Sequence, residues 1–554
     1  MRVGPVPRRA QHLAAVVGLA LAAGLLLSAQ PLRSPWWTGH DFDTVYGASA
    51  VSLFRGERST FLDHPGLPLQ ETLAAALIAD WALSDSGDSR SARANWFLSD
   101  LDRLRPHLRI LGSLLFFGSA LIAYAAVAWS ERSILGGLFA GLVLLAAPDV
   151  TVWAAVVKPD PLLAALSVAA TALLVEGARR RSGAFYVAAA AVIGYAITVK
   201  VHAVGLLAPL ALAPLLWRPQ TNGLRELADA ARRHRVAVLS VAGVYLAAAL
   251  VLNAFAASPA LRPLALLVAA LVVFALLAWA VWRVTRGTRV RLWVELGIAL
   301  VTAGLAGSVL PNLLYANLPA PALRWLTVTL SGRGVEASTT AVPPWDVLES
   351  WYGVMLLALA GFVLALRARD RTVVLWLVAA AAMGLLALFR YGSVHYYTAA
   401  IALLAPLAVP ALKALAHRPP ILAGLAAFFA LYQPFWVQVD EARDRGEIAR
   451  STERVNAWVE PRLRGRDVAL TFLESDDSRT FSLVLQYAPS TPPRQFKFLP
   501  ATSKGVEYAA QSGLDVRYVV TGAETDPAAL LASLGVQGRA TRVDAPGFVY
   551  RVEG

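Results

Sequence analysis

Residues 12–29 read HLAAVVGLALAAGLLLSA, an almost unbroken apolar run that is long enough to cross a bilayer as one helix. Comparable runs of about 17 to 22 residues recur along most of the chain. Of the 554 residues, 57% are hydrophobic and only 16% are charged, and the mean hydropathy is +0.55. Soluble domains carry about a quarter of charged residues. The sequence therefore predicts a polytopic helical membrane protein and excludes an ordinary soluble one.

Thirteen apolar segments are candidate membrane spans. They lie near residues 12–30, 108–128, 133–148, 161–176, 184–199, 203–217, 236–256, 264–282, 292–311, 351–366, 372–389, 397–415 and 419–437. The first segment is longer than the apolar core of a usual signal peptide, and many spans follow it. We therefore predict that it is a retained signal-anchor.

Short arginine clusters between these segments orient the chain, because basic loops remain in the cytoplasm. The clusters lie at residues 8–9, 179–181, 232–235, 283–291 and 367–371. The N-terminus is then cytoplasmic, in a plasma or inner membrane. The segments predicted on the extracytoplasmic side are residues 31–107, 149–160, 312–350, 390–397 and everything after 438. The net charge of +13 follows from the cytoplasmic loops and does not indicate nucleic-acid binding. The absence of cysteine excludes disulfides and thiolate catalysis.

Two domains are predicted, a transmembrane domain at residues 1–437 and a soluble extracytoplasmic α/β domain at residues 438–554. In the second, strand-like runs alternate with helix-like runs. The strand-like runs lie at 468–473, 516–521 and 548–552, and the helix-like runs at 448–459 and 527–534. The predicted fold class is thus an all-α polytopic membrane protein of about 13 transmembrane helices with a small C-terminal α/β domain.

The two long extracytoplasmic loops are expected to lie at the membrane interface. Residues 43–55 place apolar side chains at roughly helical spacing, which predicts a short interfacial helix, and a second such helix is expected after Pro68. The loop at 312–350 contains Pro343-Pro344-Trp345, which is typical of an aromatic belt.

Ionisable side chains beside membrane spans mark functional sites by default, because they are costly to place there. Four groups of candidate residues lie on the predicted extracytoplasmic side. They are Asp41 and Asp43; Lys158 and Asp160; Lys200 and His202; and Arg390 with His395, Tyr396 and Tyr397. Such a set suits a base that faces a hydroxyl acceptor and cations that face an anionic, phosphate-bearing donor.

The residues around these groups resemble motifs of the GT-C superfamily of integral membrane glycosyltransferases. The resemblance is to the branch of protein O-mannosyltransferases and lipid A aminoarabinose transferases, and it covers roughly residues 10–430. The matching patches are Asp43-Thr-Val-Tyr46, His64-Pro-Gly-Leu67, Lys158-Pro-Asp160-Pro-Leu-Leu163, Gly194-Tyr-Ala-Ile-Thr-Val-Lys200 and His395-Tyr-Tyr397. The chain departs from the branch at Thr44, where Glu is usual, and at Gly66, where a second Pro is usual.

The resemblance implies a transferase that moves a sugar from a polyprenyl-phosphate donor to a hydroxyl on a glycan, lipid or protein, with inversion. It implies that Asp43 is the base, with Asp41 and Asp160 as further catalytic candidates. The donor phosphate is expected at Lys200, Arg390, His395, Tyr397 and Lys158. Substrate contacts are expected from Tyr46, His64, His202 and Tyr396.

Several alternatives stay open. Asp41 and Asp43 could cap a helix or hold a divalent cation such as Mg²⁺ or Mn²⁺. Lys158 and Lys200 could extend from helix ends to the lipid headgroups, and the aromatic residues near 395–397 could anchor the interface. The alternative functions are a polytopic transporter or lipid flippase, whose charges would line a pathway, and a non-catalytic GT-C-like protein.

Overall fold

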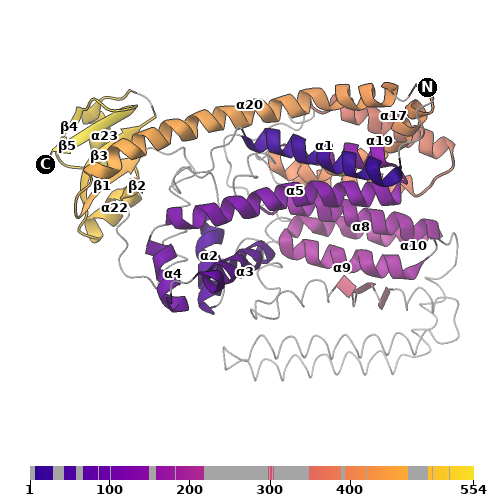
Figure 1. Cartoon of the computed structure of the whole chain (residues 1–554), viewed down its shortest axis with the longest axis horizontal. Coiled ribbons are helices and arrows are strands. Elements are labelled where there is room, and N and C mark those ends of the chain that lie inside the picture. The colour runs from indigo at the N-terminus through magenta and orange to yellow at the C-terminus, as the bar shows by residue number, and fades with distance from the viewer. Residues whose placement is uncertain are drawn as a thin grey trace, which may run out of the picture.

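In the computed structural model, the described residues form a long helical bundle with a small mixed sheet at one end (Figure 1). The structure describes residues 7–28, 43–57, 66–84, 87–99, 101–148, 157–180, 182–217, 349–388, 394–419, 421–471, 497–501, 503–522 and 524–553, with a few residues between 297 and 304. Residues 312–348 of the predicted loop at 312–350 and the predicted spans at 236–256 and 264–282 lie outside these ranges, as does most of the span at 292–311.

Ten apolar helices in the described residues coincide with the other ten predicted spans. Five are long enough and apolar enough to cross a membrane, and five are shorter. The long ones are α1 (Arg8–Ser28), α5 (Arg105–Ser130), α8 (Asp160–Arg180), α19 (Thr398–Ala416) and the first part of α20 (Ile421–Val459). The shorter ones are α6 (Ile134–Leu145), α9 (Gly183–Val199), η3 with α10 (Val201–Leu206, Leu207–Trp217), α17 (Tyr352–Arg367) and α18 (Val373–Leu388). The chain is a multi-pass membrane protein.

Helix α19 lies at the centre of the bundle and packs against α6, α8, α17, α18 and α20. Helix α17 approaches α19 closely at Gly361, where a Cβ atom would lie 2.1 Å from the backbone oxygen of Leu407. Only glycine allows two helix backbones to come so near, which is a common device between membrane helices. Helix α19 is rich in small residues, and the middle of this helix is almost completely buried.

A layer of three short helices covers one end of the bundle, where the predicted extracytoplasmic loop begins (Figure 1). They are α2 (Asp43–Arg55), α3 (Leu67–Leu83) and α4 (Arg90–Ser99), and the short helix η2 (Leu101–Leu104) leads from them into α5. The predicted helix at 43–55 is present with the same bounds. Every residue from Tyr46 to Phe54 is buried in the protein, which the sequence did not predict. The place of this helix at the membrane interface stays a prediction. Small residues on α2 let α3 and α4 pack closely on it, and α4 was not predicted.

Helix α20 runs without a break from the bundle to the C-terminal sheet (Figure 1). The predicted domain boundary at 438 therefore falls inside a helix. The sequence of α20 changes from apolar to charged after about Val439. Hydropathy therefore marks where the membrane span ends, whereas the helix continues beyond that residue.

The C-terminal part is a five-stranded sheet in the order β2-β1-β3-β5-β4. Its strands are β1 (Asp467–Thr471), β2 (Phe498–Pro500), β3 (Asp515–Thr521), β4 (Arg539–Arg542) and β5 (Phe548–Glu553). β1 pairs with β2 and β3 in parallel, and β5 pairs with β3 and β4 antiparallel. The helices of this part are η6 (Glu460–Arg462), α22 (Ser503–Gln511) and α23 (Pro527–Leu534). The strands and helix predicted at 468–473, 516–521, 548–552 and 527–534 match β1, β3, β5 and α23.

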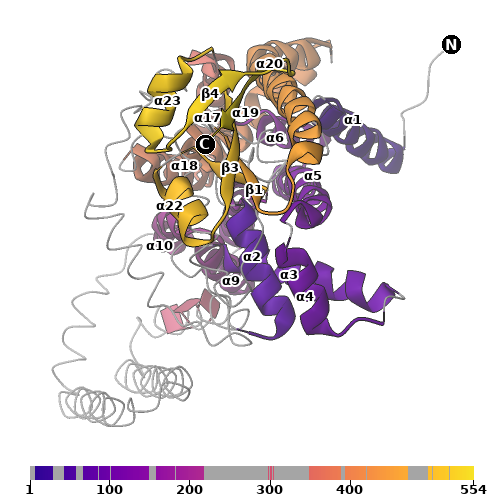
Figure 2. The ribbon, with the colours of Figure 1, turned by 90° about the vertical axis from the view of Figure 1, so that its left-hand side faces the viewer.

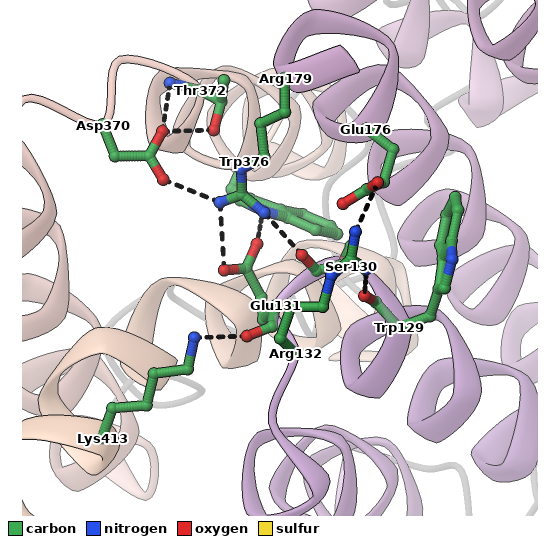
Figure 3. A network of polar contacts seen from close by, with 10 residues as sticks. All are labelled: Trp129, Ser130, Glu131, Arg132, Glu176, Arg179, Asp370, Thr372, Trp376 and Lys413. Carbon is green, nitrogen blue, oxygen red and sulfur yellow. Dashed lines mark hydrogen bonds and ion pairs between the residues drawn. The ribbon is translucent and has the colours of Figure 1, made fainter.

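At the opposite end of the bundle, a partly buried polar network ties four helical elements together (Figure 3). Arg179 of α8 donates to Glu131 at 3.2 Å and to Asp370 at 2.8 Å, and Trp376 donates to Glu131 at 3.2 Å. The ammonium group of Lys413 donates to the backbone oxygen of Glu131. Burial alone would raise the pKa of Asp370, but hydrogen bonds from Thr372 and the charge of Arg179 lower it. The network joins the predicted cytoplasmic ends of α5, α8, α18 and α19.

Candidate functional site

The candidate site is centred on an ion pair between Asp160 and Lys200 at the sheet-facing end of the bundle. Asp160 is the first residue of α8, and Lys200 directly follows the last residue of α9. The ammonium nitrogen Nζ lies 2.5 Å from Asp160 Oδ1, and the side chains are 9% and 3% exposed. The pair follows from local helix electrostatics, since an anion suits a helix N-terminus and a cation suits a C-terminus.

Two aromatic rings extend this pair toward the start of α19. Tyr396 lies in η5 (Val394–Tyr397), and Lys200 Nζ is 4.4 Å from the centre of its ring. The ring of His202, in η3, stacks on the ring of Tyr396, with the ring centres 4.9 Å apart and the planes at 29°. A cation over an aromatic face is stabilised further when water is excluded. His202 is itself buried.

The structure thus brings together members of three of the four predicted groups. Lys158 is buried two residues before Asp160, and Tyr397 packs partly buried beside Tyr396. A hydrogen bond of 3.1 Å from Thr398 to the backbone oxygen of Pro148 holds the start of α19 against the end of α6. Segments more than 200 residues apart in sequence therefore meet at this end of the bundle.

A second cluster joins the first two resembling motifs. The ring of Tyr46 lies against Gly66, where a Cβ atom would be 2.8 Å from Tyr46 Cε1 and 3.0 Å from its hydroxyl. Gly66 has a φ angle of 142°, which proline cannot adopt because its ring fixes φ near −65°. The φ angle of Gly66 therefore explains why this position does not carry the proline that is usual in the motif it resembles. Asp43 begins the helix that carries Tyr46, and His64 lies two residues before Gly66.

Buried polar contacts fix α2 against α3 in this second cluster. The hydroxyl of Ser49 donates to Gln70 Oε1 at 2.7 Å, and both residues are fully buried. Val157, directly before Lys158, belongs to the same hydrophobic core as Tyr46 and Leu108. Through Val157, the segment that leads to Lys158 and Asp160 thus packs in the core of the second cluster.

Several predicted site residues lie outside the described part of the structure. These are Asp41, His64 and Arg390, together with the side chains of Asp43 and His395. Among the described residues, no group of three His, Asp or Glu side chains could hold a metal ion. Asp41 and the side chain of Asp43, the predicted ligands of a divalent cation, lie outside the described part of the chain.

Glu71 is a carboxylate that the sequence analysis did not single out. It is the fifth residue of α3, which packs against α5 and α9, and it interacts with Tyr195 of α9. Its oxygen Oε1 is buried and has no hydrogen-bond partner among the described residues. Burial raises the pKa of Glu71 to about 7. The signal in the sequence was an acidic residue that follows the His64-Pro-Gly-Leu67 turn within an apolar helix.

Two arginines on α5 were also missed. Arg105 and Arg109 are one helical turn apart at the beginning of α5, and each is only 6% exposed. The predicted orientation puts both on the extracytoplasmic side, where arginine is disfavoured. This exception to the positive-inside rule could have singled them out in the sequence.

The arrangement as a whole can position charge at the end of an apolar bundle. The ammonium group of Lys200 donates to the carboxylate of Asp160 and places positive charge at this end of the bundle. The rings of Tyr396 and His202 form one wall beside it. Such a site suits the phosphate of a lipid whose chain remains in the bilayer.

The chain was compared with known proteins. No protein-family model matches it, and no curated protein matches it in sequence. The solved structure of an oligosaccharyltransferase from Archaeoglobus fulgidus, in the apo form, matches with a TM-score of 0.48 and 16% identity, over 92% of this chain and 69% of that chain. ArnT from Cupriavidus metallidurans bound to undecaprenyl phosphate matches with a TM-score of 0.46 and 14% identity, over 97% of each chain. ArnT in the apo state matches with a TM-score of 0.43 and 13% identity.

Proposed function

We propose that this chain is a GT-C-type membrane glycosyltransferase. It moves a sugar from a polyprenyl-phosphate donor to a hydroxyl acceptor at the extracytoplasmic face, with inversion at the anomeric carbon. The acceptor is a glycan, lipid or protein of the cell envelope. The observation that carries the proposal is the convergence of Asp160, Lys200 and Tyr396 at the end of the bundle where α2 begins.

In this proposal Lys200 holds the donor phosphate, and Asp160 positions Lys200. The ion pair of 2.5 Å fixes the ammonium group in one place at the end of the bundle. Positive charge at this point stabilises the lipid phosphate as it leaves the sugar. Asp160 is therefore a positioning residue, which replaces the catalytic role expected from the sequence. Lys158, Arg390, His395 and Tyr397 are proposed to complete the phosphate site.

The acceptor side of the site is proposed to be formed by Asp43 and Tyr46. Asp43 takes the proton of the acceptor hydroxyl as the oxygen attacks the anomeric carbon and the lipid phosphate departs on the opposite side. This single displacement inverts the configuration. Asp43 is the first residue of α2, the helix that also carries Tyr46. His64 and His202 are proposed to contact the substrates, and no step is assigned to a divalent cation.

The experiment that tests the proposal is incubation of the purified full-length protein with a panel of polyprenyl-phosphate sugars. Release of the free lipid phosphate is followed with and without added acceptors that carry hydroxyl groups. Acceptor-dependent release from at least one donor is expected. A protein that instead moves intact lipid or solute across vesicles, and releases no lipid phosphate from any donor, is a transporter or flippase.

A further inference from the structure

Two arginines at the end of the bundle opposite Lys200 share one buried carboxylate. Arg180 is the last residue of α8, and its Nε donates to Glu176 Oε2 at 2.6 Å. Arg132 lies in the turn after α5, and its Nη2 donates to the same oxygen at 3.0 Å. Figure 3 shows the guanidinium group of Arg132 between Glu176 and the backbone oxygen of Trp129, to which it also donates. The side chain of Glu176 is 1% exposed, so this carboxylate holds both guanidinium groups from inside the protein.

Both guanidinium groups of this arginine pair are accessible from outside. The side chain of Arg132 is 51% exposed and that of Arg180 is 47% exposed. Among the described residues, Nη1 and Nη2 of Arg180 have no hydrogen-bond partner. The single carboxylate of Glu176 balances only one of the two positive charges. The pair therefore keeps one net positive charge and outward N–H groups, which are the donors that match the oxygens of a phosphate.

Aromatic rings place the arginine pair at the boundary of the hydrocarbon core. Trp129 lies in the last turn of α5, a membrane span, and is exposed. Its ring centre is 5.7 Å from that of Phe185 in α9. The guanidinium carbon of Arg180 lies 5.9 Å from the centre of the Trp129 ring and 5.3 Å from that of Phe185. Because tryptophan at the end of a span is typical of the headgroup level, the pair lies at the depth of lipid phosphates.

The surface of α5 leads from the pair into the membrane. Figure 2 shows α5 at the edge of the bundle beside α1, against which it packs. Ile122 lies seven residues before Trp129, which is two helical turns along the same face, and Leu114 lies about two turns farther. Both side chains are exposed, and a Cβ atom at Gly118 would meet nothing within 4 Å. Acyl chains can lie on this open apolar face, whereas an anion dissolved in water makes no use of it.

We propose that Arg132 and Arg180 form a binding site for the phosphodiester headgroup of an anionic phospholipid. The site is separate from the donor site at Lys200, lies in the leaflet that is predicted to be cytoplasmic, and does not depend on the proposed function. One phosphodiester carries one negative charge and so neutralises the net positive charge of the pair. Glu176 positions the two guanidinium groups, and the acyl chains lie along α5 below Trp129.

Two variants and one control test this site. Arg180→Gln removes one guanidinium group, while Arg132 still pairs with Glu176. Arg132→Gly removes the other and suits the backbone, because residue 132 has a φ angle of 53°, which glycine adopts without strain. It is the second variant if Arg180→Gln impairs folding. The matched control is Arg418→Gln, which removes one charge at an exposed arginine beyond α19, at the same end of the bundle but outside the pair.

Native mass spectrometry of the full chain in detergent measures binding of three ligands. They are phosphatidylglycerol, the neutral lipid phosphatidylcholine, and glycerophosphoglycerol, which is the anionic headgroup without acyl chains. We expect the wild type to bind phosphatidylglycerol roughly fivefold more tightly than phosphatidylcholine and to bind glycerophosphoglycerol far more weakly. Arg180→Gln and Arg132→Gly should each bind phosphatidylglycerol roughly tenfold more weakly, through loss of a charge-assisted hydrogen bond. Arg418→Gln should bind it as the wild type does.

Three results would overturn the inference. The first is equal affinity of the wild type and both variants of the pair for phosphatidylglycerol. The second is an equal loss in Arg418→Gln, because it would show a general attraction of the basic surface for anionic lipid and no site at the pair. The third is equally tight binding of glycerophosphoglycerol and phosphatidylglycerol, because the ligand would then be a soluble anion and not a lipid.

Discussion

Lys200 Nζ donates a hydrogen bond of 2.5 Å to Asp160 Oδ1, and this contact joins the C-terminus of α9 to the N-terminus of α8. The two residues are 40 positions apart and both are almost fully buried. A buried ion pair is weak evidence for stability, because desolvation offsets the attraction of the charges. Its retention at the end of a membrane bundle therefore suggests a role in binding.

The ion pair makes a prediction about stability. Lys200→Gln or Asp160→Asn alone leaves one buried charge without its partner and should lower the free energy of unfolding by about 3 kcal/mol or more. The double variant removes both charges and should recover most of this loss. Thermal unfolding of the three variants in detergent measures the effect. Additive losses in the double variant would mean that the two side chains do not interact in the folded protein.

Much of the membrane domain could be predicted from the sequence, because the bilayer itself imposes the length and apolarity of each span. The short helix at 43–55 was predicted with its bounds, but its burial was not. Side chains such as Ser49 read as weakly polar in the sequence, and their burial depends on α3 and α4 packing around them. Helical spacing alone cannot distinguish a helix at an interface from one inside a packed layer.

The candidate site was predictable only in part. Asp160, Lys200 and Tyr396 were assigned to one side of the membrane, but spacing could not show that they touch, because their contact depends on how α8, α9 and η5 pack. Glu71 was missed for the same reason, since its environment is created by α9. Sequence patterns identify ionisable residues, whereas tertiary packing determines their partners.

The raised pKa of Glu71 leads to a prediction about how the stability of the protein depends on pH. Its pKa is raised to about 7 from an ordinary value of 4.5, so the folded protein loses stability as the pH rises through this interval. Glu71→Gln cannot ionise and should be more stable than the wild type at pH 8, by roughly 1 to 2 kcal/mol after allowance for solvent screening. At a pH of about 4 the two proteins should unfold at similar temperatures.

The control for Glu71 is Glu57→Gln, at an exposed carboxylate of the same helical layer. This variant should keep the pH dependence of the wild type. If the difference between Glu71→Gln and the wild type is the same at both pH values, ionisation of Glu71 does not affect folding.

The contact between Gly66 and Tyr46 leads to a prediction about the stability of a Gly66 variant. Gly66→Ala must accommodate a φ angle of 142° and a Cβ atom 2.8 Å from the Tyr46 ring, and should lose about 2 to 3 kcal/mol. Gly56→Ala is the matched control, because Gly56 also has a positive φ angle, 88°, but open space around it. It should lose about 1 kcal/mol. Chemical denaturation measures both, and equal losses would show that Tyr46 does not restrain this turn.

The proposed role of Asp43 as the base leads to a prediction about the turnover rate. Asp43→Asn keeps the shape of the side chain but cannot accept a proton, so the rate should fall by about 10² to 10⁴ while donor binding is retained. Asp41→Asn is the comparison. Single-turnover release of the lipid phosphate from an active donor decides between the two positions. An inactive Asp41→Asn with a normal Asp43→Asn would move the base by two residues, and normal rates in both would exclude a base in this segment.

The most direct test of the account is a titration of undecaprenyl phosphate against the double variant Asp160→Asn/Lys200→Gln in detergent. This variant lacks the ammonium donors but leaves no buried charge unpaired, so it should unfold close to the temperature of the wild type. Arg179→Gln, in the network at the opposite end of the bundle, is the control for general damage. The account predicts that the double variant binds the lipid phosphate at least roughly tenfold more weakly, through loss of a charge-assisted hydrogen bond, and that Arg179→Gln binds it normally. Unchanged affinity in a folded double variant would contradict the account.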